Sequence, residues 1–240
     1  PDEPSDMSLA VVQLRRMHVS CDEVEIDDAA MARHGLLVSS EAVMGNGVAE
    51  DLEHVVYLKP EVFDPSMTRT IATEVAVHNR HLMAAGHPYL LMGFGRWGSS
   101  DPWLGVPVQW SDIAGAKVIV EATSPKMSPT LSQGSHFFHN MISFGVLYLS
   151  VQHNRDTPID WHWLDSLPAI AESSYVRVVH APRPLAVRVD GRQRRGVIRH
   201  DNRESAPTSH QGAGGRLIAT LQERAKELNC LYEIEDILGR

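Results

Sequence analysis

The stretch that decides the fold covers residues 89–151 and reads YLLMGFGRWGSSDPWLGVPVQWSDIAGAKVIVEATSPKMSPTLSQGSHFFHNMISFGVLYLSV. Its apolar runs at residues 89–92, 116–121 and 146–151 have the length and composition of buried strands. An apolar, helix-length segment at residues 133–145 precedes the third run. Strands separated by loops and a helix at these spacings predict βαβ construction, in which the carboxyl ends of the strands and the first turn of the helix meet at one edge.

Turn residues crowd into residues 93–102, GFGRWGSSDP, so strand periodicity stops there and we expect an irregular loop. Arg96 and Asp101 lie in this loop, and His136 lies at the start of the expected helix. Because the loops and helix starts of a βαβ unit converge, these three side chains are expected at the same edge of the sheet.

Composition limits the class of protein. A chain of 240 residues with 43% hydrophobic residues can bury the core of one large domain, or of one domain plus appendages. The net charge of -8 argues against a partner that presents a phosphate backbone, so no nucleic acid is expected. Cys21 and Cys230 have no metal-ligand spacing, and the chain has no signal-like or membrane-length apolar run. We therefore expect a cytoplasmic protein without a membrane partner.

Further elements are expected on both sides of the central stretch. Before it we expect strands at residues 9–14, 36–43 and 54–58, a turn at 44–47, and a helix at 68–85 that ends at Gly86. After it we expect a short helix at 161–164 capped by Asp160, half-buried antiparallel strands at 175–179 and 185–189, a basic turn at 191–196, a strand at 197–198, and an amphipathic helix at 216–228. Asp27 and Asp28 belong either to a solvated acidic linker or to the cap of a short helix through Ala32.

The order of several segments between residues 36 and 151 resembles the swivelling phosphohistidine domain of phosphoenolpyruvate synthase and pyruvate phosphate dikinase. The segments are residues 45–49 (GNGVA), 55–58 (VVYL), 89–92 (YLLM), 101–103 (DPW) and 116–121 (AKVIVE), followed by Ser135-His136. The resemblance covers about half of the chain. It implies an α/β fold with residues 35–154 as a swivelling β/β/α phosphohistidine-like domain, and leaves residues 155–240 as a smaller α+β extension with a terminal helix.

The same resemblance suggests site residues and partners. Ser135-His136 falls where the family places its phosphorylated histidine, at the start of a helix. Residues 11–15 resemble the strand that ends the ATP-grasp domain of these enzymes, so residues 1–34 would be the end of such a domain plus a linker. Gln13 and Arg15 would then form part of a nucleotide site, and ATP and Mg²⁺ would be supplied with a domain that is absent from this chain.

The sequence departs from the family pattern around His136. Gly134 stands at the position of a threonine, Phe137 and Phe138 replace small residues, and Ile142 replaces an arginine. A phosphohistidine needs donors and cations for the phosphoryl charge, so two natural partners are missing.

Other residues offer partners for a phosphoryl group. A helix start favours an anion, and Ser135 adds one donor. Arg96 can hold a phosphate bidentately, and Ser99 and Ser100 follow it in the same loop. The structural alternative is that His136 packs at a helix start and that Arg96 is a clamp between two turns that carry tryptophans.

Two functions remain in view at this point. In the first, His136 accepts a phosphoryl group from an ATP-grasp domain, with Arg96 and Ser135 stabilising it, as the relay part of a phosphoenolpyruvate-synthase-like phosphotransferase. In the second, the chain is a non-catalytic regulatory or assembly domain that binds a small phosphorylated ligand at the Arg96 loop. The losses around His136 favour the second.

Metal and dinucleotide sites are weaker interpretations. His78 and His81 lie three apart on an expected helix, where we predict that they face solvent, and His136 with His139 lacks a third ligand, so no metal is expected. Residues 93–98 match GxGxxG by letters, but Asp101-Pro102 stands where the helix of a dinucleotide-binding unit should begin.

Overall fold

One mixed sheet of nine strands organises the part of the chain that the structure describes, residues 24–32, 35–129, 144–152 and 159–200 of a computed structural model. The strands are β1 Leu36–Ser40, β2 Val43–Met44, β3 Gly47–Leu58, β4 Tyr89–Phe94, β5 Arg96–Trp97, β6 Gly105–Val106, β7 Ala116–Ala122, β8 Leu147–Val151, β9 Ala169–Glu172, β10 Val176–Asp190 and β11 Arg195–Arg199. The helices are α1 Asp28–Ala32, α2 Thr68–Ala84 and α4 Trp161–Ser166, with 3-10 turns η1 Pro65–Met67 and η2 Trp110–Asp112.

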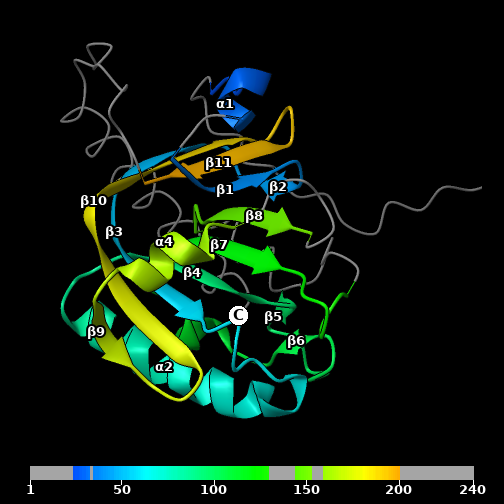
Figure 1. Cartoon of the computed structure of the whole chain (residues 1–240), viewed down its shortest axis with the longest axis vertical. Helices are drawn as coiled ribbons and strands as arrows, with labels where there is room; N and C mark the ends of the chain where they lie inside the picture. Colours follow the sequence, from blue (N-terminus) through cyan, green and yellow to red (C-terminus); the bar gives the residue numbers. More distant parts are fainter. Residues whose placement is uncertain (1–23, 33–34, 130–143, 153–158, 201–240) are drawn as a thin grey trace, which may run out of the picture. The chain divides into compact units, whose positions relative to one another are not determined.

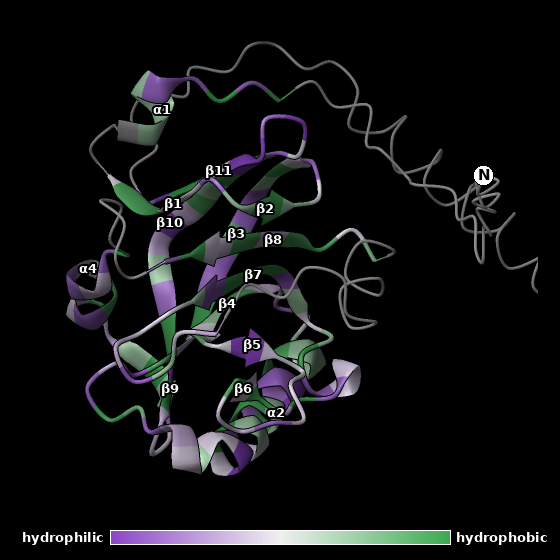
Figure 2. Ribbon diagram, turned by 90° about the vertical axis from the view of Figure 1, so that its right-hand side faces the viewer, coloured by the Kyte–Doolittle hydropathy of each residue, from purple (hydrophilic) through white to green (hydrophobic). Residues whose placement is uncertain are grey.

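The sheet has a parallel half and an antiparallel half (Figure 1). Its order is β1-β11-β10-β3-β4-β7-β8-β2, with β9 paired to β10 and with β5 and β6 forming a separate two-stranded sheet. Strands β3, β4, β7 and β8 are parallel to one another, whereas β1, β11, β10 and β3 alternate in direction. In Figure 2 the strands run from β1 and β11 at the top to β4, with α2 below. The predicted α/β class is confirmed at this level.

Helices α2 and α4 contact side chains that point to opposite faces of the parallel half of the sheet. The Tyr89 hydroxyl at the start of β4 donates to Asn79 of α2 (2.9 Å), whereas the Phe94 ring at its end lies 5.4 Å from the Trp161 ring of α4. All six residues of β4 and all five of β8 are buried. Strands covered in this way need apolar side chains throughout, which is why these runs were recognisable in the sequence.

The ends of the sheet meet through the turn between β1 and β2. The Ser40 hydroxyl donates to the carbonyl of Ser150 in β8 at 2.5 Å, and the Ser150 amide donates to the carbonyl of Ala42 at 2.8 Å. Gly45, in the turn before β3, has φ +91°, the left-handed conformation that glycine adopts without strain. A single chain segment therefore links the β11 end of the sheet to the β8 end.

Several local predictions are confirmed, whereas the prediction for His78 is wrong. Helix α2 ends at Ala84 and is followed by Gly86 with φ +72°, and Asp160 caps α4 by accepting from the Trp163 amide at 2.9 Å. His78 was predicted on the helix surface but is only 7% exposed. Its Nε2 lies 3.1 Å from the Ser173 hydroxyl, because the segment before β10 covers this face of α2.

Strand β10 replaces two predicted strands. Residues 175–179 and 185–189 were expected separately, but the structure joins them in one strand with register shifts against β3 between His180 and Val187. A basic turn was expected at 191–196; the turn between β10 and β11 covers residues 191–194, because Arg195 and Gly196 already pair with β10 as part of β11. Strands before and after the expected domain boundary at residue 154 pair within one sheet, because β10 lies between β3 and β11.

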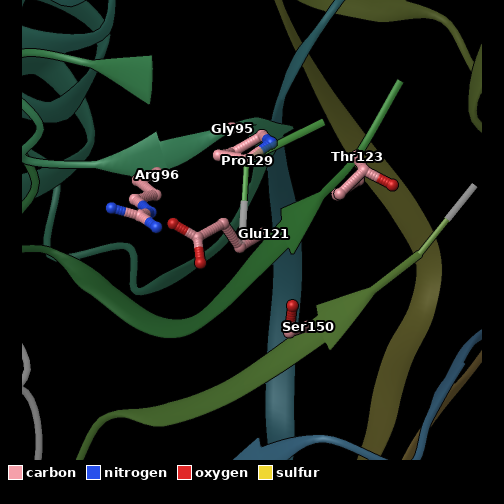
Figure 3. A pocket seen from close by; sticks show the side chains of 7 residues that line it. Gly95, Arg96, Glu121, Thr123, Pro129 and Ser150 are labelled. Carbon is pink, nitrogen blue, oxygen red and sulfur yellow. The ribbon is translucent and has the colours of Figure 1, made fainter. Parts of the chain in front are cut away.

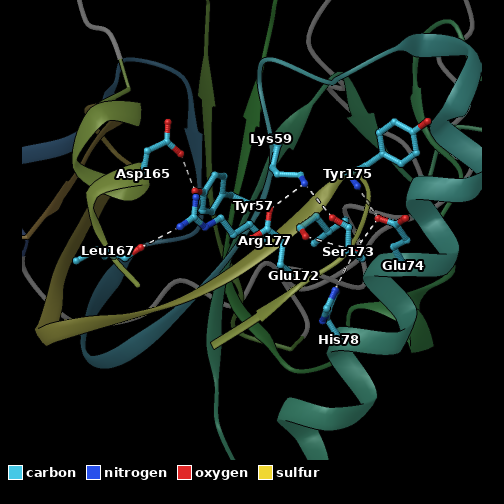
Figure 4. A network of polar contacts seen from close by, with 11 residues as sticks. Tyr57, Lys59, Glu74, His78, Asp165, Leu167, Glu172, Ser173, Tyr175 and Arg177 are labelled. Atoms are coloured by element: carbon cyan, nitrogen blue, oxygen red, sulfur yellow. Dashed lines mark hydrogen bonds and ion pairs between the residues drawn. The ribbon is translucent and has the colours of Figure 1, made fainter. Parts of the chain in front are cut away.

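A polar network fastens the helices to this sheet (Figure 4). The Tyr57 hydroxyl of β3 donates to Asp165 of α4 at 2.8 Å. Glu74 of α2 accepts from the Ser173 hydroxyl at 2.6 Å and from the Tyr175 amide at 2.9 Å. These bonds join segments about one hundred residues apart, so they hold the architecture in place. Among the described residues, no helix combines the length and apolar character needed to cross a membrane.

Three histidines gather at the edge of the sheet where β4 begins. The His54 ring of β3 stacks on His87 with centroids 4.4 Å apart, and the His180 ring of β10 meets it edge-on at 4.9 Å. Burial, followed by repulsion from His87 and His180, lowers the pKa of His54 from 6.5, with Glu53 opposing the shift. The folded protein therefore binds a proton at His54 less readily than the unfolded chain does.

We predict that acid destabilises the protein through this cluster. Below about pH 6.5 the unfolded chain takes up a proton at His54 that the folded state resists, so the free energy of unfolding falls as pH decreases. Urea unfolding at pH 7.5 and at pH 5.0, on either side of about pH 6.5, measures the loss in the free energy of unfolding. His54→Gln should reduce it, whereas the exposed His162→Gln should leave it as in the wild type. An equal loss in all three proteins would contradict the prediction.

Candidate functional site

A small hollow lies where the parallel strands β4 and β7 end and β8 runs beside them (Figure 3). It is lined by Gly95, Arg96, Glu121, Ala122, Thr123, Pro129 and Ser150. About 10 Å³ of it can hold the centre of a water molecule, which is room for about one water. The predicted meeting point of strand ends is therefore present, and Arg96 is at it.

Glu121, near the end of β7, is the charged centre of this site. It is only 4% exposed, and its Oε1 accepts from the Trp97 amide at 3.0 Å while its Oε2 accepts from the Tyr148 hydroxyl. Figure 3 shows the Arg96 guanidinium facing the Glu121 carboxylate. A buried carboxylate needs such partners, because leaving water without them is costly.

Tyr148 of β8 is held in its protonated form. Burial raises its pKa above the ordinary value, and the charge of Glu121 and the hydrogen bond to it act in the same direction. Ser150 and Arg96 oppose the shift because they favour the phenolate. At neutral pH the phenol is therefore a hydrogen-bond donor fixed on Glu121.

Ser150 lies beside this pair on the same face of the sheet. It pairs in register with Glu121, it is two residues after Tyr148, and it is 5% exposed. Its backbone amide and carbonyl are engaged by Ala42 and Ser40. Its hydroxyl is near the Tyr148 phenol, but within the described residues Ser150 Oγ has no partner with the distance and angle of a hydrogen bond.

The glycines of the Arg96 loop serve close packing. A side chain at Gly93 would meet the Trp97 ring at 2.3 Å, and one at Gly105 would meet the Arg96 backbone at 1.8 Å. Residues 93–102 were predicted to be irregular, but Gly93 and Phe94 still belong to β4, and β5 pairs with β6, so that prediction is wrong for residues 93, 94, 96 and 97. The glycines of the GxGxxG pattern therefore allow chain segments to pack closely, with the Trp97 indole ring over Gly93.

Other predicted residues of this loop do not line the hollow. The Ser99 hydroxyl donates to the Asp101 carbonyl at 2.9 Å, and the Asp101 carboxylate accepts from the Trp103 amide at 2.9 Å. Ser100 is exposed. Of the predicted site residues in this loop, the structure therefore brings only Arg96 to the hollow, because Ser99 and Asp101 close the turn that follows β5.

The remaining predicted site residues, Gln13, Arg15, Ser135 and His136, lie outside the described residues. The described chain stops at Pro129, which lines the hollow, and resumes at Phe144, whose ring stacks on Trp110 with centroids 5.2 Å apart.

Sequence reasoning missed Glu121, Thr123 and Ser150 as lining residues of the hollow. Glu121 and Ser150 are polar residues near the ends of otherwise apolar strands, AKVIVEA and LYLSV. That contrast was the available signal for both of them.

Neither a group of metal ligands nor a similar known protein gives further information about this site. Among the described residues, no group of three or more His, Cys, Asp or Glu side chains is arranged to hold a metal ion. Comparisons of the chain with protein-family models, with curated proteins and with solved structures find no match in any of the three. Functional inference therefore rests on residue chemistry and geometry.

We predict that Gly93→Ala displaces the Arg96 loop. The added methyl group overlaps the buried Trp97 ring, so the free energy of unfolding should fall by about 3 kcal/mol. Gly86→Ala is the control, because that position has φ +72° but open space, and it should cost about 1 kcal/mol. Urea unfolding of the three proteins measures both values. Equal losses would show that the contact between Gly93 and Trp97 is not tight.

We also predict a delayed ionisation of tyrosines. Burial raises the pKa of Tyr57, Tyr89 and Tyr148, so three of the five tyrosines should stay protonated above pH 10 while the protein is folded. Above that pH the unfolded chain loses these protons and the folded state keeps them, so stability falls as pH rises. Ultraviolet absorbance during an alkaline titration counts the delayed groups. Tyr89→Phe should reduce the count from three to two, and a single transition near pH 10 for all five would refute the prediction.

Proposed function

We propose that the chain is the phosphoryl-relay part of a phosphoenolpyruvate-synthase-like phosphotransferase with a swivelling β/β/α domain. His136 would accept a phosphoryl group from an ATP-grasp domain of the same or a longer chain, and Gln13 and Arg15 would belong to the nucleotide site. Mg²⁺ would arrive with ATP and neutralise phosphate charge. A cytoplasmic setting is part of the proposal.

The observation that carries the proposal is a cation beside a hollow at the carboxyl edge of parallel strands. Arg96 lines this hollow together with the hydroxyl-bearing residues Thr123 and Ser150. His136 follows Pro129, another lining residue, by seven positions, so its backbone lies within about 25 Å of Pro129 even along a fully extended chain. That range allows His136 to reach Arg96.

The proposed step needs positioning and charge neutralisation more than covalent help from the protein. A ring nitrogen of His136 would attack a phosphorus of ATP, a P–N bond would form, the bond from that phosphorus to a bridging oxygen would break, and the nucleotide on the far side of that oxygen would leave. Arg96 can form two parallel hydrogen bonds to phosphoryl oxygens, which supports the charge that develops on them. Ser135 would supply a further donor.

One observation favours the competing function, a non-catalytic domain that binds a small phosphorylated ligand. The Arg96 guanidinium faces the buried Glu121 carboxylate, which is fixed by Trp97 and Tyr148. A cation matched in this way attracts the negative charge of a phosphoryl group less strongly than an unmatched one does. Gly134 and Ile142, at positions where the family has a threonine and an arginine, point in the same direction.

Phosphorylation of His136 is the direct test. The longest natural form of the chain is incubated with Mg-ATP and analysed by intact mass and peptide mapping. We expect acid-labile phosphate on the His136 peptide, none in His136→Ala, and the wild-type amount in the control His139→Ala. Arg96→Gln should slow phosphorylation by about 100-fold.

Two results would count against the relay. The absence of phosphate on a chain that binds ATP would refute it. Binding of a phosphate analogue that survives His136→Ala but is lost in Arg96→Gln, on a chain that is never phosphorylated, would instead support the ligand-binding domain.

A further inference from the structure

We infer that the hollow between β7 and β8 is an oxygen pocket that takes one terminal oxygen of a phosphoryl group, with Ser150 as the residue that binds this oxygen. The inference rests on the proposed function, since it names the chemical group that the Arg96 site receives. The ligand class is a group with a bare PO₃ terminus, either carried on the protein or part of a small phosphorylated molecule.

The size of the hollow sets what can enter. About 10 Å³ is open to the centre of a water molecule, which is near the lower limit for one water and therefore for one oxygen atom. A whole phosphoryl group is too large to enter. Its phosphorus would stay at the mouth, on the side of Arg96, while one oxygen occupies the hollow.

The chemistry of the lining provides a hydrogen bond for that oxygen. Ser150 Oγ is buried, lines the hollow, and has no hydrogen-bond partner of proper geometry in the described part of the chain. Buried hydroxyls are rarely left in this state, because burial without a partner forfeits their bonds to water. The Ser150 amide donates to the Ala42 carbonyl and the Ser150 carbonyl accepts from the Ser40 hydroxyl, so the backbone that carries this side chain is fixed before any ligand arrives.

The charges around the hollow determine the strength of binding. Arg96 attracts an anion, whereas Glu121 repels it, although both carboxylate oxygens of Glu121 accept hydrogen bonds from Trp97 and Tyr148. The wild-type site should therefore bind phosphate weakly. Removal of the Glu121 charge should therefore strengthen phosphate binding. If Glu121 instead held the ligand through a bound cation, the same change would weaken binding.

The test uses inorganic phosphate and methyl phosphate with the full chain, monitored by ³¹P nuclear magnetic resonance at low ionic strength. We expect Ser150→Ala to weaken the binding of both by about tenfold, which is the typical effect of one hydrogen bond to a charged group. Glu121→Gln should bind them more tightly than the wild type. The exposed Ser111→Ala is the matched control and should bind as the wild type does.

A second variant guards against an effect of Ser150→Ala on folding. Ser150→Thr keeps the hydroxyl but adds a methyl group to a hollow that has room for one oxygen, so it should also lose affinity. Thermal unfolding and the circular dichroism of every variant establish that the fold is kept. Dimethyl phosphate, which lacks a bare PO₃ terminus, should bind more weakly than methyl phosphate.

The two sources of the phosphoryl group are separated by a second readout, the lifetime of phosphate on His136. A phosphate affinity that persists in His136→Ala and falls in Ser150→Ala assigns the pocket to a ligand from solution. A shorter phosphohistidine lifetime in Ser150→Ala assigns it to the carried group. If Ser150→Ala and Ser150→Thr change neither quantity in folded protein, the hydroxyl faces only water and the inference is overturned. That outcome leaves phosphorylation of His136 itself untouched, so the two proposals fail separately.

Discussion

The buried carboxylate of Glu121 is the constraint on which the rest of the site depends. A charge that is 4% exposed is tolerable only where donors surround it, and here Trp97 and Tyr148 supply them from two different segments. The Trp97 amide can reach Glu121 because β5 folds back over β4, and this crossing needs glycine at position 93. Loop geometry and glycine placement therefore serve one charge, and that charge adds to the burial that raises the pKa of Tyr148.

The strands around this site could be predicted because buried strands require apolar residues, and such runs can be recognised in the sequence. All residues of β4 and β8 are buried, so β4 appears as an apolar run and β8 as an apolar run that only Ser150 interrupts, and the helix stop at Gly86 has a local physical cause. Arg96 was found because loops at the carboxyl ends of parallel strands meet at one edge of the sheet. Local patterns of this kind need no knowledge of the tertiary contacts.

The predictions that were wrong concern properties that only tertiary contacts create. His78 is buried because a segment almost one hundred residues later covers it, and nothing within α2 indicates this. β5 exists only because residues 105–106 return beside it. Glu121 and Ser150 become neighbours through the register of two strands separated by a long connection, and a register cannot be derived from either strand alone.

The turn that joins the two ends of the sheet has a consequence for how the molecule forms. β1 pairs with β11, so Leu36 lies opposite Arg199, and the next strand along the chain, β2, pairs with β8. Contacts of such long sequence separation must wait for a large loop to close, which slows folding. On the ribosome, the strands between Leu36 and Arg199 cannot complete their sheet until nearly all of it has been synthesised. A chain that ends before β11 would leave β1 without its ladder partner and β10 with an exposed edge, and such edges promote aggregation.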